Sequence, residues 1–249
     1  PERSAPTMRI DEILFGAVGA RLIPERGPPE RHHRGGIGRA RDDKETLYQL
    51  LQKHQIPLIE DDVYAELYFG TKAPHPVKSF DQDGLVMHCG SFSKSLAPGY
   101  RVGWVAGGRY TEQINRLKLM TTISPSVPAQ AAIADYLQHG GYDRHLRKLR
   151  DTLEIQQNAM LAAAARYFPR DTRVSKPVGG YFLWFEFPER VDTLQLFQLA
   201  LAQDISLTPG PIFSATERFR NCARLNYGHP WDKRSEDAMA LLGRMIATF

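Results

Sequence analysis

The sequence predicts an α/β fold, in which a mostly parallel sheet with helices is followed by a small α+β C-terminal domain. From Lys44 onward, short apolar runs typical of buried strands alternate with helical patterns of apolar residues. A long charged helix over 141–167 then precedes a second, smaller set of strands and helices. The chain of 249 residues is also long enough to bury the core of one large domain or two small ones.

Composition places the chain among ordinary globular proteins. Hydrophobic residues make up 42% and charged residues 24%, which argues against disorder throughout. No apolar run approaches the roughly 20 residues of a membrane-spanning helix, and the sequence does not open on a signal segment. The two cysteines, Cys89 and Cys222, lie in apolar runs, as reduced core thiols do. We therefore expect a cytoplasmic location and no membrane partner.

Residues 1–43 form an atypical N-terminal segment. The stretch over 21–41 mixes Pro, Gly and Arg without sustained apolar periodicity, so we expect mostly irregular structure. A short helix is possible over 8–23, where apolar residues recur at helical spacing. His32 and His33 have no partner at metal-ligand spacing, and we expect no metal site.

The remainder of the large domain is assigned to 44–140. Its expected elements are a helix from Lys44 with Leu47, Leu50 and Leu51 on one face, strands over 56–60, 85–89 and 101–107, and helices over 111–123 and 128–138. The short connections favour neighbouring strands that pair in a parallel or mixed sheet.

An interdomain helix over 141–167 separates this part from the small C-terminal domain, 168–249. Leu146, Leu149 and Leu153 follow one face of the helix. The small domain is expected to contain strands over 179–188, 204–210 and 222–228 and helices over 192–203 and 231–248.

The segment SFSKSLAPGYRVGW (91–104) places Lys94 among small hydroxyl residues. A lysine amine forms a Schiff base with a carbonyl cofactor when it is held deprotonated close to that carbonyl. The hydroxyls of Ser91 and Ser93 and the guanidinium of Arg101 can bind phosphate oxygens. These residue types suit an aldehyde that is anchored by a phosphate. The alternative is a solvated loop lysine, as isolated motifs of this kind usually contain.

A carboxylate and a phenol follow the first buried strand, in EDDVY (60–64). Ligands of open α/β sheets bind beyond the carboxyl ends of the strands, where this segment is expected to lie. Asp61 can hold a protonated pyridine nitrogen, and Tyr64 can hydrogen-bond a ring hydroxyl. The alternatives are a helix N-cap or a strand-end acid at Asp61 and an amphipathic core residue with a satisfied hydroxyl at Tyr64.

Arg224 stands inside the otherwise apolar strand CARLNYG (222–228). An unpaired buried charge is costly, so this arginine is expected to have a carboxylate partner, which an amino acid or a 2-oxo acid can supply. The alternative is an arginine on an edge strand that faces water.

Together these motifs resemble fold-type I aminotransferases of class I and II, and the resemblance covers most of 45–249. PVGGYFLWFEF (177–187) and LTPGPIF (207–213) are similar to the small-domain strand and the substrate-side loop of that family. The resemblance implies a partial fold-type I large domain and pyridoxal 5'-phosphate as the cofactor. It further implies these roles: Asp61 at the pyridine nitrogen, Tyr64 at the ring hydroxyl, Lys94 in the internal aldimine, Ser91 and Arg101 at the phosphate, and Arg224 at the substrate carboxylate.

A narrower resemblance, carried by IEDDVYAEL, SFSKSLAPGYRVGW and CARLNYGHPW, is to the aminotransferase-like half of MocR-type regulators in the GntR family. In those transcription factors an N-terminal winged helix-turn-helix binds DNA, and the cofactor-binding half is a dimerising sensor. The resemblance implies a homodimer that forms a lysine aldimine and senses or converts an amino compound. The alternatives are a stand-alone class I/II aminotransferase, which would be a transaminase, and a cofactor-free truncated remnant.

The sequence departs from the family pattern in residues 1–43. They lack the Gly-containing phosphate loop, the aromatic residue that stacks on the pyridine ring and the Asn-Pro-x-Gly segment, so the N-terminal part is missing or altered. A segment with one possible helix cannot form a winged helix-turn-helix, and we expect no direct DNA binding by this chain. We also expect weaker cofactor binding, because each missing charge-assisted contact is worth about 1.5–3 kcal/mol.

Overall fold

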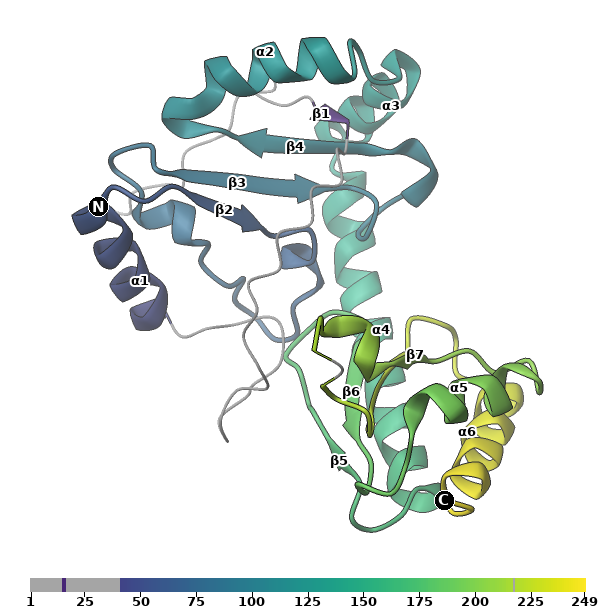
Figure 1. Cartoon of the computed structure of the whole chain (residues 1–249). Coiled ribbons are helices and arrows are strands. Elements are labelled where there is room, and N and C mark those ends of the chain that lie inside the picture. Colours follow the sequence, from purple (N-terminus) through teal and green to yellow (C-terminus); the bar gives the residue numbers. More distant parts are fainter. Residues whose placement is uncertain (1–14, 17–40, 217) are drawn as a thin grey trace. The chain divides into compact units, whose positions relative to one another are not determined.

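The computed structural model describes residues 15–16, 41–216 and 218–249, which form two compact units (Figure 1). The division falls between Leu149 and Arg150, inside the helix α4 (Gly141–Tyr167). Each unit has its own sheet. The domain boundaries drawn from the sequence, at 43/44, 140/141 and 167/168, stay predictions.

The first unit contains a four-stranded sheet with the order β1-β4-β3-β2. Its strands are β1 (Phe15–Gly16), β2 (Leu58–Asp61), β3 (Val86–Ser91) and β4 (Val102–Ala106). Only β2 and β3 are parallel, whereas β3/β4 and β1/β4 are antiparallel. Residues 92–101 connect β3 to β4 without a crossover helix, and a parallel pair needs such a crossover. The described sheet is therefore mixed rather than mostly parallel.

The structure corrects two sequence-based predictions for the N-terminal part. Phe15–Gly16 form a strand, not part of a helix over 8–23, and the other residues of that range lie outside the described part of the chain. Helix α1 (Arg41–His54) begins before Lys44. Asp42 and Asp43 occupy its first turn, where negative charge is favourable to the helix dipole.

The other helices of the first unit are α2 (Thr111–Thr121), α3 (Val127–Gln138) and the start of α4, as the sequence predicts. Short 3-10 helices connect the elements: η2 (Ala65–Leu67), η3 (Val77–Phe80), η4 (Pro98–Tyr100) and η5 (Gly108–Tyr110). One apolar cluster joins Tyr48 of α1 to Val77 and Val86, whereas Leu50 of the same helix is exposed. A second cluster joins Phe92, Val102 and Ile133 beside the connection from β3 to β4.

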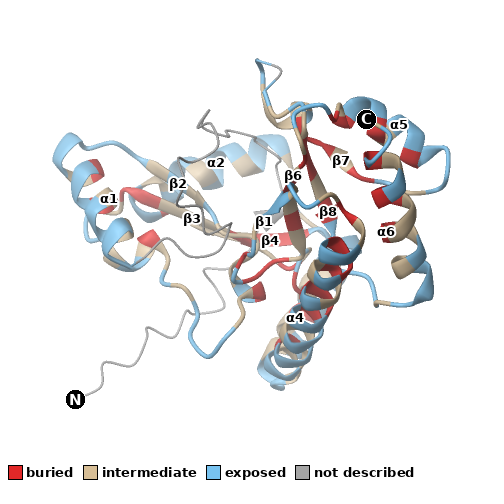
Figure 2. Cartoon of the chain, turned by 90° about the horizontal axis from the view of Figure 1, so that it is seen from below, coloured by how far each residue is buried: buried red, intermediate tan, exposed pale blue. Residues whose placement is uncertain are grey.

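The second unit has an antiparallel sheet with the order β5-β6-β8-β7. Its strands are β5 (Arg173–Val174), β6 (Phe182–Glu186), β7 (Thr208–Pro209) and β8 (Cys222–Asn226), accompanied by η6 (Gly210–Phe213), α5 (Thr193–Leu201) and α6 (Lys233–Ile246). The strand expected over 204–210 is shorter, and β5 was not expected. Figure 2 shows buried residues along α4. The buried side chains of this helix include Leu146, Leu153 and Met160.

No helix within the described ranges is long and apolar enough to cross a membrane. Within the same ranges, no group of three or more His, Cys, Asp or Glu side chains is arranged to hold a metal ion. His32 and His33 lie outside the described residues.

Candidate functional site

The carboxyl ends of β2 and β3 form one edge of the first unit's sheet. The two strands are parallel, with Asp61 opposite Cys89, so β2 ends at Asp61 and β3 continues to Ser91 on the same side. Ligands of open α/β sheets bind at edges of this kind. The candidate residues of both segments therefore belong to one region.

At the end of β2, Asp61 is exposed and its Oδ1 accepts a hydrogen bond of 3.4 Å from the backbone N–H of Val63. The bond turns the chain away from the sheet, as aspartate commonly does after a strand. Tyr64 follows, half-buried, at the start of η2. Asp61 is the last residue of β2, so the alternative of a strand-end acid stays open, and the roles of Asp61 and Tyr64 stay predictions.

At the end of β3, the chain closes into a tight turn around Lys94. The hydroxyl of Ser91 accepts a hydrogen bond of 3.1 Å from the backbone N–H of Ser93. The carbonyl of Phe92 accepts bonds from the backbone N–H groups of Leu96 at 2.8 Å and Ala97 at 2.9 Å. The Lys94 side chain is exposed, so the backbone is fixed while the amine can reach a ligand.

Lys94 and Tyr64 lie close together. The lysine Nζ is 5.9 Å from the centroid of the Tyr64 ring, within the range of a cation–π contact. The structure thus brings together the lysine of one segment and the phenol of the other, which are 30 positions apart in the chain.

Arg101 lies at the same edge, immediately before β4. Ser91 pairs with Gly103 across the antiparallel β3/β4 ladder, which places the start of β4 beside the end of β3. Arg101 is exposed and has φ 53° and ψ 39°, in the left-handed region. For a residue with a Cβ this conformation costs roughly 1–2 kcal/mol. Arg101 therefore carries backbone strain at a candidate ligand site, as functional residues often do.

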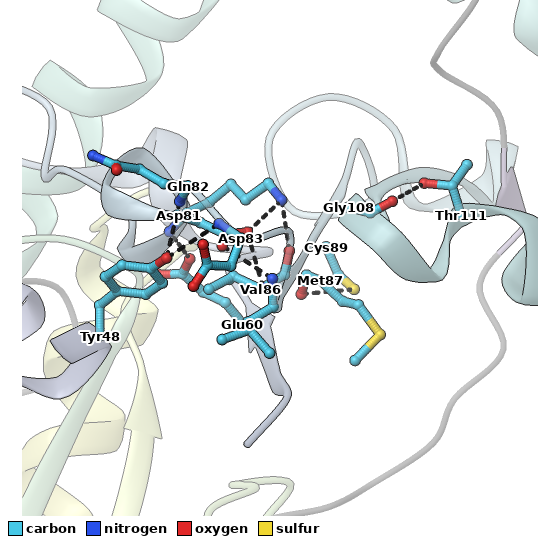
Figure 3. Close-up of polar contacts among 12 residues, drawn as sticks. Tyr48, Glu60, Asp81, Gln82, Asp83, Val86, Met87, Cys89, Gly108 and Thr111 are labelled. Atoms are coloured by element: carbon cyan, nitrogen blue, oxygen red, sulfur yellow. Dashed lines mark hydrogen bonds and ion pairs between the residues drawn. The ribbon is translucent and has the colours of Figure 1, made fainter. Parts of the chain in front are cut away.

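A buried carboxylate network supports this edge from the other end of the strands (Figure 3). The side chain of Asp81 is fully buried and accepts bonds from the backbone N–H groups of Leu85 and Val86, both at 3.0 Å, and from Lys78 Nζ at 2.8 Å. Burial alone would raise the pKa of Asp81, but these hydrogen bonds together outweigh burial and hold its pKa below the usual value.

The same network fixes β2. Both carboxylate oxygens of Glu60 accept backbone N–H groups of η3, from Val77 at 2.8 Å and from Lys78 at 3.0 Å. Tyr48 adds a hydroxyl that accepts the backbone N–H groups of Gln82 and Asp83. The residue before Asp61 is thus held rigidly in place.

A contact between His88 and Asp62, beside the candidate residues, was not predicted from the sequence. His88 Nε2 lies 3.1 Å from Asp62 Oδ2, and the His88 ring packs edge-on against Trp104 at 4.9 Å between centroids. Trp104 lies against Gly90, where an added Cβ would clash with the indole. The acidic run at 60–62 indicated a carboxylate, but its partner becomes visible only through the register of β2 and β3.

Arg224 belongs to the second unit. It lies on β8, which pairs on both sides, with Trp184 of β6 and Thr208 of β7 as neighbours. The guanidinium carbon is 4.1 Å from the Phe182 ring centroid and 5.0 Å from that of Phe213. Its Nε is buried and has no hydrogen-bond partner among the residues that the structure describes. Because β8 is not an edge strand, the alternative of an edge arginine facing water is wrong.

The residues of the first unit fit a phosphorylated aldehyde. An exposed amine, two hydroxyls and a guanidinium stand at one edge together with an acid and a phenol. As a donor, the Ser91 hydroxyl makes a long bond of 3.4 Å to the Val102 carbonyl, which an anion can displace. The fit therefore rests on the exposed side chains of Lys94 and Arg101 and on the hydroxyls beside them.

Comparison with known proteins identifies the family and the fold. The sequence profile of the family aminotransferase class I and II matches residues 36–230. An uncharacterized HTH-type transcriptional regulator, YdcR of Escherichia coli K12, is 44% identical over 203 residues, covering 82% of this chain and 43% of that protein. The chain thus spans less than half the length of this relative.

Solved aminotransferase structures share the fold. The multiple substrate aminotransferase of Thermococcus profundus is 29% identical with a TM-score of 0.77, over 83% of this chain and 52% of that chain. The α-aminoadipate aminotransferase LysN of Thermus thermophilus, complexed with N-(5'-phosphopyridoxyl)-L-leucine, is 27% identical with a TM-score of 0.77, over 83% of this chain and 54% of that chain.

Proposed function

This chain belongs to the class I and II aminotransferases, and on that premise we propose that it binds pyridoxal 5'-phosphate through Lys94. One observation carries the proposal. Lys94 stands on a turn with a fixed backbone, its side chain is exposed, and its amine faces Tyr64 at the edge that also holds Asp61, Ser91 and Arg101. The phosphopyridoxyl group bound to LysN supports the choice of cofactor.

Each candidate residue has a chemical task in this proposal. The amine of Lys94 would hold the cofactor at its aldehyde carbon, with the aldehyde oxygen leaving as water, and Ser91, Ser93 and Arg101 would bind the phosphate. Asp61 keeps the pyridine nitrogen protonated, and Tyr64 donates to the ring oxygen. When bound, the cofactor supplies a ring that withdraws electrons from the carbon next to the amine of a substrate.

The proposed ligand is an amino acid or a similar amino compound whose carboxylate binds Arg224. The guanidinium lies over the rings of Phe182 and Phe213, and its Nε has no acceptor among the described residues. A carboxylate can satisfy such a planar fork with two hydrogen bonds. The unpartnered Nε therefore supports a carboxylate ligand for Arg224.

We further infer that this domain is part of a MocR/GntR-type transcriptional regulator, in which it senses the amino compound. The supporting observation is the 44% identity to YdcR, over the part of that regulator to which this chain corresponds. The second candidate is a transaminase, supported by the likeness to the solved aminotransferases. In a transaminase Lys94 would also move a proton at the substrate carbon next to the amine. Full conversion of an amino acid would favour the enzyme.

A homodimer is part of the proposal. Apolar side chains are exposed on α2 and after it: Leu117, Leu119, Met120 and Ile123, with Met120 81% exposed. Contiguous exposed apolar surface marks interaction sites in soluble proteins. Sedimentation of the wild type and of Met120→Lys tests this assignment, because a charge at that position should shift the protein towards the monomer.

A reducing, cytoplasmic location fits both cysteines. Cys89 and Cys222 are free thiols. Burial raises the pKa of the Cys222 thiol to about 11, so the reactive thiolate is scarce at neutral pH. Such thiols are typical of core positions in a reducing compartment.

The experiment that tests cofactor binding is a titration with pyridoxal phosphate followed by visible absorption and borohydride reduction. Wild type should give a yellow, reducible adduct that maps to Lys94, and Lys94→Ala should give none. Lys72→Ala, which removes another exposed lysine of the same unit, should behave as wild type. An adduct spread over surface lysines, or equal in Lys94→Ala, would refute the proposal.

A further inference from the structure

Ser95, the residue after Lys94, is buried and bound to the start of α4. Its exposed fraction is 2%. Its hydroxyl lies 2.7 Å from the hydroxyl of Tyr142, and its backbone carbonyl lies 2.8 Å from His145 Nε2. A carbonyl can only accept, so Nε2 carries the proton in this arrangement. One residue of the lysine turn is thus held through both its side chain and its backbone.

The other side of the turn is fixed within the turn itself. Ser93 is held by the Ser91 hydroxyl, and the Phe92 carbonyl closes the loop behind Lys94. The ring of Tyr142 packs edge-on against Phe92, with 5.8 Å between centroids. Lys94 therefore stands between two anchored serines, with only its own side chain free to move.

We propose that Tyr142 and His145 are positioning residues, which set the place of the Lys94 amine through Ser95. The proposal rests on the proposed function, because it concerns the reaction of that amine with pyridoxal phosphate. Apolar contact alone could seat α4 on the turn, but hydrogen bonds are directional and fix the rotation of the backbone at residue 95. The rate of amine attack on a carbonyl depends on such placement at the scale of 1 Å.

Two kinds of variant separate positioning from stability. Tyr142→Phe keeps the ring on Phe92 and removes the hydroxyl, and Ser95→Ala removes the other partner of the same bond. His145→Leu removes the donor to the Ser95 carbonyl, whereas His145→Gln can restore an N–H near the position of Nε2. Tyr167→Phe is the matched control, because Tyr167 lies on the same helix and donates a bond of equal length, 2.7 Å, to Glu236.

Two readouts are measured for each variant. The first is the rate at which pyridoxal phosphate forms the borohydride-reducible adduct at Lys94. The second is the affinity for 4-deoxypyridoxine phosphate, a phosphorylated analogue without an aldehyde. A change in fold alters both, whereas misplacement of the amine alters only the first.

We expect Tyr142→Phe and Ser95→Ala to slow adduct formation by about threefold to tenfold, which corresponds to one lost hydrogen bond. The double variant should be no slower than either single variant, because both remove the same bond. His145→Leu should also slow adduct formation, whereas His145→Gln should form the adduct at nearly the wild-type rate. All of these variants should keep the wild-type affinity for 4-deoxypyridoxine phosphate.

Unchanged rates in these variants, or parallel losses of rate and analogue affinity, would overturn the positioning role while leaving Lys94 as the cofactor residue. Absence of any Lys94 adduct in the wild type would overturn the proposed function and this inference together. The wild-type measurement thus distinguishes the two failures.

Discussion

The ammonium of Lys94 lies 5.9 Å from the centre of the Tyr64 ring. The two residues follow the ends of neighbouring parallel strands, so the contact joins the two segments at the candidate site. A cation over an aromatic face at an exposed site gains about 0.5–1 kcal/mol. In the free protein, Tyr64 therefore holds the lysine side chain at the edge where a cofactor would bind.

This contact leads to a prediction for Tyr64. Tyr64→Phe keeps the ring under Lys94 and removes the hydroxyl, so affinity for pyridoxal phosphate should fall by about threefold to tenfold, as for one hydrogen bond. Tyr64→Leu also removes the aromatic ring, so its affinity for pyridoxal phosphate should fall further. Equilibrium titrations of the absorption band measure both, and equal affinities for wild type and Tyr64→Phe would rule out a role for the hydroxyl.

Arg101 allows phosphate binding to be separated from backbone strain. Arg101→Gly removes the strain of the left-handed conformation, whereas Arg101→Ala retains that strain. In urea unfolding we therefore expect the glycine variant to be more stable than the alanine variant by about 1 kcal/mol. Both variants lose the same guanidinium. Their affinity for pyridoxal phosphate should fall by roughly tenfold or more, since a charged hydrogen bond is worth about 1.5–3 kcal/mol.

Pyridoxal, which has no phosphate, is the control ligand for Arg101. Its binding should be equal in wild type and both variants. A drop of similar size with pyridoxal would show that Arg101 acts through the fold of the turn and not through the phosphate.

The parts of the candidate site formed by residues close together in the sequence could be predicted. The residues from Ser91 to Arg101 form one continuous segment, and the strand before Asp61 is a clear apolar run. The bond between Ser95 and Tyr142 spans 47 positions, and no local pattern indicates it. The helical spacing of Tyr142 and His145 shows that they share a face, but not which turn that face meets.

The strand expected over 204–210 shows how a helix end can override an apolar pattern. The backbone N–H of Ile205 donates to the Ala200 carbonyl at 2.9 Å, and Asp204 is left-handed with φ 59°. These residues complete the end of α5 and are unavailable to the sheet. Only Thr208–Pro209 remain as β7, paired with Arg224 and Ala223.

Arg224 is predicted to control the response to amino acids but not cofactor binding. Arg224→Glu should abolish the spectral response of the cofactor-loaded protein to amino acids, because the introduced carboxylate repels the carboxylate of the amino acid. Arg224→Lys should weaken it, since lysine cannot form the planar fork. Formation of the Lys94 adduct should be unaffected in both.

Arg218 provides the control for Arg224. It is an exposed arginine of the same unit, 5.5 Å from the Phe219 ring centroid. Arg218→Glu changes the charge equally and should leave the amino-acid response intact. A normal response in Arg224→Glu would refute the carboxylate role.

Asp81 should make stability depend on acid pH. Its pKa is lower in the folded protein than the value of about 3.9 expected for an unfolded chain. The contribution of the Asp81 carboxylate to the free energy of unfolding is therefore fully present above about pH 4. It is lost as the pH falls through the pKa of Asp81 in the folded protein. Asp81→Asn loses charged hydrogen bonds to Lys78 and the backbone, so we expect about 2–3 kcal/mol lower unfolding free energy at pH 7.

The pH series distinguishes this carboxylate from surface charges. Below pH 4 the gap between wild type and Asp81→Asn should narrow, because the wild-type carboxylate becomes protonated. Asp237→Asn, which breaks an exposed pair with Lys233, should change stability by less than about 1 kcal/mol at any pH. A gap between wild type and Asp81→Asn that stays constant from pH 7 to pH 2 would mean that Asp81 contributes by shape and not by charge, because only the charge is lost on protonation.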